Sequence, residues 1–555
     1  MDYKHSYAFE INHRRNVISD ESLAIGHLLS RELMKMSIVD RTAIEEEIHG
    51  VQCLAINETS ELIKKTMDEF HAELIRIPNN KKRTYEECRI RAILYKDEIE
   101  CYALNHDFKL RFLRAELFDA AKASQRFVNY LEFVREHWGT DIALKRFTRF
   151  SDFTKAEMKL FRKGYFQALP FRDNSGRRVI SLLGGFNPEV DPISRTKVLF
   201  YLADTLTRND VESQQKGLVL ITESYCWSLD QDKGEKRSTK SLRFPHPLEG
   251  LHYTKQMLES TPNRMTAIHN CWPDRPAFRI IAKLLTLYGM DASTGRIRLK
   301  FHIGDELEMR YRLKSYGIPV ELLPITETGS IKMINHNYWI KTRKQIEQGI
   351  DTSVIIVECP GLNDVVFRQG TSSMEHPGNV RCRNLILSLL EETERETPSS
   401  SSASIAGLVG GSNHTVMISK YHNDNVDRVC FHIEVHRSGQ FLEWDKRRSS
   451  WIQMEDRSKI KQKVSVLFHS VDRRYRRTPA SRSGSAAGNK IFVESSEEDE
   501  VGTEANNYDN KTNLEPYTFL EGGKEKLEKQ QCCETKFRTN NPRSPGDRRK
   551  RSKRN

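Results

Sequence analysis

The sequence Asn270-Cys-Trp-Pro273 is followed by Pro276-Ala-Phe-Arg-Ile-Ile-Ala-Lys-Leu-Leu-Thr-Leu-Tyr288 and then by Arg296-Ile-Arg-Leu-Lys-Phe-His302. The second run predicts an amphipathic helix, because apolar residues recur in it at helical spacing. The third run alternates basic and apolar residues, as a half-buried strand does. A helix with one apolar face beside a sheet is either ordinary core packing, which the spacing alone favours, or one wall of a pocket for an apolar ligand.

The segments around this stretch alternate between strand and helix patterns. Predicted strands are Arg177–Leu183, Lys216–Glu223 and Met265–Asn270, and predicted helices are Ser194–Arg208 and Leu248–Glu259. The second strand is almost continuously apolar, which is typical of a strand buried on both faces. Strands that alternate with helices indicate an α/β domain, in which a sheet is covered by helices. We place this domain at residues 151–342.

The rest of the chain follows other patterns. Helical periodicity predicts an all-helical N-terminal part, divided into an extension (1–78) and a second region (79–150). After a linker (343–360), residues 361–475 predict a small α+β domain whose hairpin is formed by Gly439–Trp444 and Ser450–Met454. Its last helix would bury Ile460, Val464, Leu467 and Val471. Residues 476–555 lack periodicity and carry blocks of acidic and basic residues, so we expect a disordered tail.

Composition bounds the class of protein. The chain has 555 residues, 37% hydrophobic and 30% charged, with a formal net charge of +12. No apolar run approaches the roughly 18 residues of a membrane span, and the first residues lack the apolar core of a signal peptide. We therefore expect a cytoplasmic protein, with the nucleus as an alternative because of the basic run Arg548–Arg554. The positive charge favours an anionic partner, either a lipid surface or nucleic acid.

Catalytic and metal-binding patterns are weak throughout. The chain contains no Gly-x-Ser-x-Gly, no Cys-x-x-Cys and no convincing carboxylate pair, so we expect neither an enzyme nor a cofactor or metal site. His432 and His436 have metal-ligand spacing, but no third ligand is evident and an ordinary histidine pair is favoured. In His376-Pro-Gly-Asn379, we expect Asn379 to cap the following helix and Gly378 to adopt backbone angles that other residues avoid.

Several motifs occur in an order that resembles the CRAL-TRIO family, which includes retinaldehyde-binding, tocopherol-transfer and phosphatidylinositol-transfer proteins. They are Phe112-Leu-Arg-Ala115 with Phe118-Asp119, Gly176-Arg-Arg-Val179, Gly217-Leu-Val-Leu-Ile221, Ile268-His-Asn-Cys-Trp-Pro273, the helix with Phe278, and Leu323-Pro324 with Gly329. The resemblance covers about residues 105–340. The segment Met36–Gln52 also resembles a helical leader found ahead of such domains in microalgal proteins.

The resemblance implies a lipid-binding pocket with the helix 276–288 as its gate. The residues expected to contact the ligand are Ile180, Leu182, Leu220, Phe278, Ile281, Leu285, Tyr288 and Arg296. Family members that bind inositol lipids carry an acidic residue after the proline corresponding to Pro262, whereas Asn263 stands here. Inositol-lipid specificity is therefore not implied, although Arg296 matches the basic residue that enters the last strand in those members.

The motifs Asn363–Gly370 and His376–Asn379, with Gly439–Asp445 and Trp451, resemble a domain of unknown function that recurs in microalgal proteins. The element order of this domain is also compatible with a winged-helix-like nucleic-acid binder. In that alternative, phosphate contacts would come from Arg368, Lys459, Lys461, Lys463, Arg473, Arg474, Arg476 and Arg477. The alternative reading of these cations is a solvated helix face beside a basic linker.

These patterns together predict a non-enzymatic protein that binds a hydrophobic small molecule or phospholipid. One version of this hypothesis adds transfer of the bound ligand. Its gate would open at a transiently bound membrane surface, and the second domain would contact a protein or nucleic-acid partner. The alternative function is that of a nuclear nucleic-acid or chromatin adaptor acting through residues 361–555.

Overall fold

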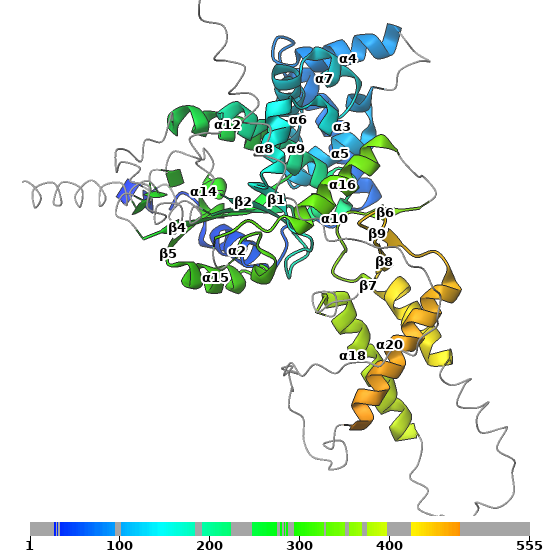
Figure 1. Cartoon of the computed structure of the whole chain (residues 1–555). Coiled ribbons are helices and arrows are strands. Elements are labelled where there is room, and N and C mark those ends of the chain that lie inside the picture. Colours follow the sequence, from blue (N-terminus) through cyan, green and yellow to red (C-terminus); the bar gives the residue numbers. More distant parts are fainter. Residues whose placement is uncertain are drawn as a thin grey trace, which may run out of the picture. The chain divides into compact units, whose positions relative to one another are not determined.

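A computed structural model (Figure 1) describes residues 27–28, 30–31, 34–94, 101–183, 191–223, 247–274, 278–279, 282–283, 285–286, 293–326, 329–349, 354–368, 375–396 and 423–477. All of them belong to one compact unit, Met1–Ser481. The expected tail beyond residue 477, including Arg548–Arg554, lies outside the described residues. Of the helices that the structure describes, none combines the length and apolar character needed to cross a membrane.

The first sheet has five strands in the order β1-β2-β3-β4-β5. Strand β1 is antiparallel to β2, and β2 to β5 run parallel. Every residue of β2 is buried, as are all but one in β3. The predicted strands are therefore confirmed, and the chain is a mixed α/β protein. The strands are β1 (Phe166–Ala168), β2 (Arg178–Leu183), β3 (Leu218–Glu223), β4 (Met265–Pro273) and β5 (Leu299–Gly304).

Helices cover one face of this sheet, which we name the first face. Figure 1 shows α6, α8, α9 and α12 on this side. Ile180, Leu220 and Ile268 of the sheet pack there with residues of α9 and α6 in the largest apolar core. The helices of this half are α3 (Ser60–Arg76), α4 (Arg83–Leu94), η1 (Tyr102–Leu104), α5 (His106–Ala115), α6 (Ala120–Trp138), α7 (Thr140–Lys145), η2 (Phe150–Asp152), α8 (Lys155–Arg162), α9 (Pro192–Thr207), α10 (Val211–Lys216) and α12 (Pro247–Ser260).

The opposite, second face carries α2 (Ile38–Ile48) and α15 (Glu306–Ser315), which lie below the sheet in Figure 1. Ile44 and Ile48 of α2 share a core with Val179, Val219 and Ile221. Helix α2 lies within the segment Met36–Gln52, which was expected to be helical. Its apolar side covers a sheet, which its acidic composition did not indicate. The elements that complete this half are α14 (Ser293–Arg298), η3 (Val320–Leu322) and α16 (Ile334–Gln348).

The C-terminal part contains a second, four-stranded sheet in the order β6-β9-β8-β7. Strands β8 and β9 form the predicted antiparallel hairpin, and β7 is parallel to β8. The last helix buries Ile460, Val464 and Val471 as expected, with Leu467 partly buried. The elements are β6 (Ile356–Val357), β7 (Val365–Phe367), α18 (Pro377–Glu396), the π-helix η4 (His432–His436), β8 (Phe441–Asp445), β9 (Ser450–Gln453) and α20 (Arg457–Arg477).

Three details differ from the sequence patterns. The strand expected from Arg296 begins only at Leu299, because Ser293–Arg298 forms the short helix α14 and Arg298 turns inward to pair with Glu47. The segment assigned to a linker at 343–360 begins inside α16 and contains β6, which belongs to the second sheet. Helix α20 continues to Arg477, two residues into the expected tail, which was placed at 476–555.

Candidate functional site

The carboxyl ends of β4 and β5 carry a small apolar cluster on the first face. Trp272 is fully buried and packs against Phe278 and Phe301, with ring centroids 5.2 and 4.9 Å apart. Ala282 is also buried in this cluster, and Leu285 and Ile303 pack against it. The described residues of the predicted gate, 278–279, 282–283 and 285–286, are helical. The apolar side of this helix therefore lies on the sheet, as its spacing predicts.

The structure does not bring all the expected ligand contacts together. Ile180, Leu182 and Leu220 belong to the large core on the first face, whereas Phe278 and Leu285 belong to the separate cluster at the strand ends. Near the boundary between these two clusters, Thr222 Oγ1 of β3 donates a hydrogen bond to Asn270 Oδ1 of β4 over 2.6 Å. Ile281 and Tyr288 lie outside the described residues.

The two residues considered for a headgroup occupy different surroundings. Asn263 is buried, and its Nδ2 donates to the carbonyl oxygen of Ala203 over 3.0 Å. It therefore ties the start of β4 to α9. Arg296 lies in α14 and is partly buried.

Two buried histidines face each other on the second face. His269 Nδ1 of β4 and His302 Nε2 of β5 are 2.9 Å apart, so one ring donates to the other. Burial, with Arg312 and Lys300 nearby, lowers the pKa of His302 to about 4. Burial, His302, Arg177, Lys300 and His49 hold the pKa of His269 well below its ordinary value. Both rings are therefore neutral in the folded protein at neutral pH.

This pair predicts acid lability. The folded-state pKa of His302 lies below its unfolded value of about 6.5, so the unfolded chain takes up the proton first. Stability should be complete above about pH 6.5 and fall as the pH drops toward 4, by about 3 kcal/mol for His302 alone. Urea unfolding measured from pH 7 to pH 4 should show this slope, and His302→Gln should reduce it. His106→Gln, at an exposed site, is the control. An unchanged slope in His302→Gln would contradict the assignment.

The cations considered for nucleic-acid binding are largely engaged within the second half of the chain. Lys461 pairs with Asp427 at 2.6 Å, Lys463 with Glu443 at 2.9 Å and Lys459 with Asp456 at 3.7 Å. The Arg368 guanidinium stacks on Trp444, 4.0 Å from the ring centroid. The remaining arginines of this set lie in the last turns of α20 and are Arg473, Arg474, Arg476 and Arg477.

The histidine pair of the π-helix has a protein partner. The rings of His432 and His436 are 5.2 Å apart, and Arg437 Nε donates to His432 Nε2 over 3.1 Å. Within the described ranges, no three His, Cys, Asp or Glu side chains gather as a metal site would require.

The motif His376-Pro-Gly-Asn379 has a structural role, but this role is not the expected helix cap. Asn379 lies inside α18 and does not cap it. Its Oδ1 accepts from the backbone N–H of Val366 and its Nδ2 donates to the Val366 carbonyl, each over 2.8 Å. A Cβ on Gly378 would lie 1.9 Å from the carbonyl oxygen of Asp364. Glycine is thus needed for close approach of the helix to β7 and not for unusual backbone angles.

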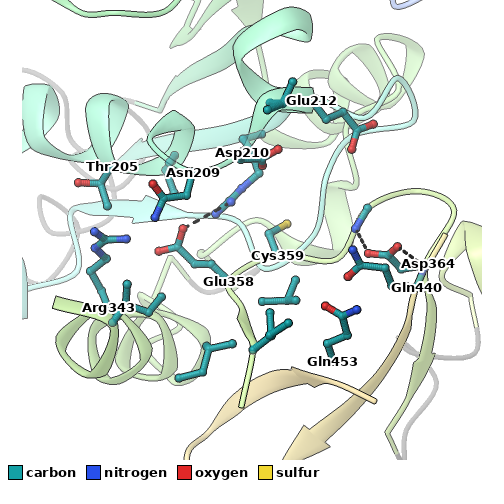
Figure 2. A pocket seen from close by; sticks show the side chains of 18 of the residues that line it. Thr205, Asn209, Asp210, Glu212, Arg343, Glu358, Cys359, Asp364, Gln440 and Gln453 are labelled. Carbon is teal, nitrogen blue, oxygen red and sulfur yellow. Dashed lines mark hydrogen bonds and ion pairs between the residues drawn. The ribbon is translucent and has the colours of Figure 1, made fainter. Parts of the chain in front are cut away.

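A polar cleft lies where the segment 354–361 passes between the two sheets, and Figure 2 shows its lining. Its volume is about 570 Å³, and its walls come from residues 172–178, 205–212, 343–349 and 354–364, with Gln440 and Gln453. Asp210, Glu358 and Arg343 reach it from three different segments (Figure 2). Sequence patterns did not indicate this cleft.

Arginines and carboxylates alternate around the cleft. Arg172 is buried and donates to Asp210 Oδ2 over 2.5 Å and to Ser213 Oγ over 2.9 Å. Although burial opposes ionisation, Arg172 and Arg178 hold the pKa of Asp210 below its ordinary value. Arg178 faces Glu358 across a longer gap, 3.6 Å between Nη1 and Oε2.

A scan against protein-family models gave no match, and a search of curated proteins found none similar to this sequence.

Proposed function

We propose that this protein binds a hydrophobic small molecule or phospholipid, without chemical change, at the carboxyl edge of the first sheet beneath the helix 276–288. The observation that supports this proposal is the separate cluster of Trp272, Phe278 and Ala282. A helix that belonged to the main core would join its apolar residues to that core. Here the described apolar residues of the helix, Phe278, Ala282 and Leu285, pack at the strand ends.

The position is also the one where open parallel sheets bind ligands, since the carboxyl ends of their strands border a crevice. Apolar side chains suffice to hold an acyl or isoprenoid chain, because each buried CH₂ contributes about 0.8 kcal/mol. In this proposal the helix opens at a membrane surface, the ligand exchanges and the helix closes again. The second half of the chain serves as the module that binds a partner.

Lipid loading of the full chain tests this function. Native mass spectrometry should find a lipid on the purified protein or after incubation with phospholipid vesicles. Phe278→Asp should abolish loading, because it places a charge in the apolar cluster. The matched control is Arg279→Glu at the neighbouring position, which breaks only an exposed ion pair with Asp274 and should load normally. A ligand-free mass under all conditions, or normal loading of Phe278→Asp, would contradict the proposal.

A further inference from the structure

Four buried polar atoms around the polar cleft have no hydrogen-bond partner among the residues that the structure describes. They are Arg178 Nε, Thr205 Oγ1, Gln345 Oε1 and Glu358 Oε1. Arg178 and Thr205 are only 2% and 3% exposed. A buried polar group without a partner costs about 1–3 kcal/mol, and such groups are rare in folded proteins. All four belong to residues that line one cavity, where a bound molecule can complete the hydrogen bonds.

The four atoms define what that molecule must carry. Arg178 Nε can only donate, so the molecule needs an acceptor. Gln345 Oε1 and Glu358 Oε1 can only accept, so it also needs donors. The hydroxyl of Thr205 can do either. A simple anion such as sulfate offers acceptors alone and would leave the glutamate oxygen facing a like charge.

The charges of the cleft lead to the same conclusion. Several charged groups are already committed: Arg172 to Asp210, Glu212 to Lys216 at 2.7 Å, and Asp364 to the backbone N–H groups of Gly361 and Gln440. Arg343 pairs with Glu347 through its Nε at 3.2 Å. Arg178 and Glu358, one cation and one anion, are separated by a loose 3.6 Å contact. A ligand with one negative and one positive group would match both.

We propose that the polar cleft binds a free α-amino acid in its zwitterionic form. The α-carboxylate accepts from Arg178 and from the nearby guanidinium of Arg343, and the α-ammonium donates to Glu358 and Gln345. Charge-assisted hydrogen bonds of this kind are the strong ones in a buried site. Figure 2 shows Thr205, Arg343 and Glu358 around the same end of the cleft, reached from α9, α16 and the segment after β6.

The remaining space suits an amino-acid side chain. Leu206, Ile346, Val354 and Val357 add apolar surface to the cleft, whose volume of about 570 Å³ exceeds what the charged groups of the ligand need. Strand β6 is the edge of the second sheet and borders the cavity, and an edge strand offers unpaired backbone groups. The bound amino acid would therefore also connect the segment 354–361 with the first half of the chain.

Isothermal titration of the full chain with each common L-amino acid tests this site. At least one should bind with one-to-one stoichiometry at concentrations up to about 10 mM. The amine and the carboxylic acid that correspond to the best ligand, each lacking one charged group, should bind at least about tenfold more weakly. The absence of binding by every amino acid would overturn the proposal. So would equal binding of the two analogues, or binding of inorganic phosphate in place of the amino acids.

Two variants locate the binding. Thr205→Val removes a hydroxyl that has no partner among the described residues, so the fold should keep its stability while affinity falls. Glu358→Gln should weaken binding about tenfold or more, because it removes the charge opposite the ammonium. Glu434→Gln, which lies in an ion pair with Arg457 outside the cleft, should bind normally. Unchanged affinity in both cleft variants, with unchanged melting temperatures, would place the ligand elsewhere and overturn the assignment.

Discussion

Replacing Glu47 with alanine is expected to lower the free energy of unfolding by about 3–5 kcal/mol. Glu47 is the 1%-exposed carboxylate of α2 and pairs with Arg264 and, at 2.6 Å, with Arg298. Its Oε1 also accepts from the backbone N–H of Leu54 over 2.9 Å. Removing it leaves two buried guanidinium groups without their carboxylate, and an uncompensated buried charge is far costlier than a lost surface contact.

Glu45, two residues earlier on the same helix, provides the matched control. It pairs with Lys300, but its side chain is 43% exposed. Exposed ion pairs contribute at most about 1 kcal/mol, so Glu45→Ala should change stability little. Urea unfolding of both variants, with the same dependence on denaturant as the parent protein, would measure the difference. Similar losses for the two substitutions would mean that α2 is not held to the sheet by the Glu47 network.

The sequence predicted the first sheet well because the information was local. Lys216–Glu223 reads as a buried strand, and β3 does lie between two parallel neighbours. The covering role of α2 could not be predicted in the same way. Its composition is acidic, and the partners of Glu47 are Arg264 and Arg298, more than 200 residues further along the chain. Periodicity does not report on pairing at such separations.

The same difference between local and long-range information explains which candidate sites the sequence predicted. The helical spacing of 276–288 correctly places Phe278 and Leu285 against the sheet, since one face of a helix is a local property. The polar cleft was missed because its walls come from segments far apart in the sequence, among them 205–212, 343–349 and 354–361. Asn379 was misjudged for a related reason. An asparagine near a helix start is usually a cap, and only the three-dimensional structure shows that it binds the backbone of β7.

The second large effect is expected at Asp204, where Asp204→Ala should cost about 3–5 kcal/mol. This carboxylate of α9 is fully buried and accepts from Arg111 of α5 over 2.7 Å and from Arg208 over 2.5 Å. Although burial opposes ionisation, Arg208 and Arg111 hold the pKa of Asp204 below its ordinary value. The carboxylate therefore neutralises two buried cations where the N-terminal helices join the cover of the sheet.

Asp141→Ala is the control for this prediction, because Asp141 is 75% exposed and pairs with Lys145 on the surface. It should cost less than about 1 kcal/mol in the same urea titration. A loss in Asp204→Ala no larger than in Asp141→Ala would contradict a structural role for the buried carboxylate.

A triple variant, Arg111→Met, Asp204→Leu and Arg208→Met, separates the two physical causes of the loss. Buried ion groups replaced together by apolar side chains of similar volume are often close to neutral for stability. If the loss in Asp204→Ala comes from unpaired charge, the triple variant should recover most of it. If it comes from packing between α5 and α9, the triple variant should remain as unstable as the single one. We expect recovery, because both guanidinium groups already lie against an apolar surface, 4.5 Å (Arg208) and 5.9 Å (Arg111) from the ring centroid of Phe147.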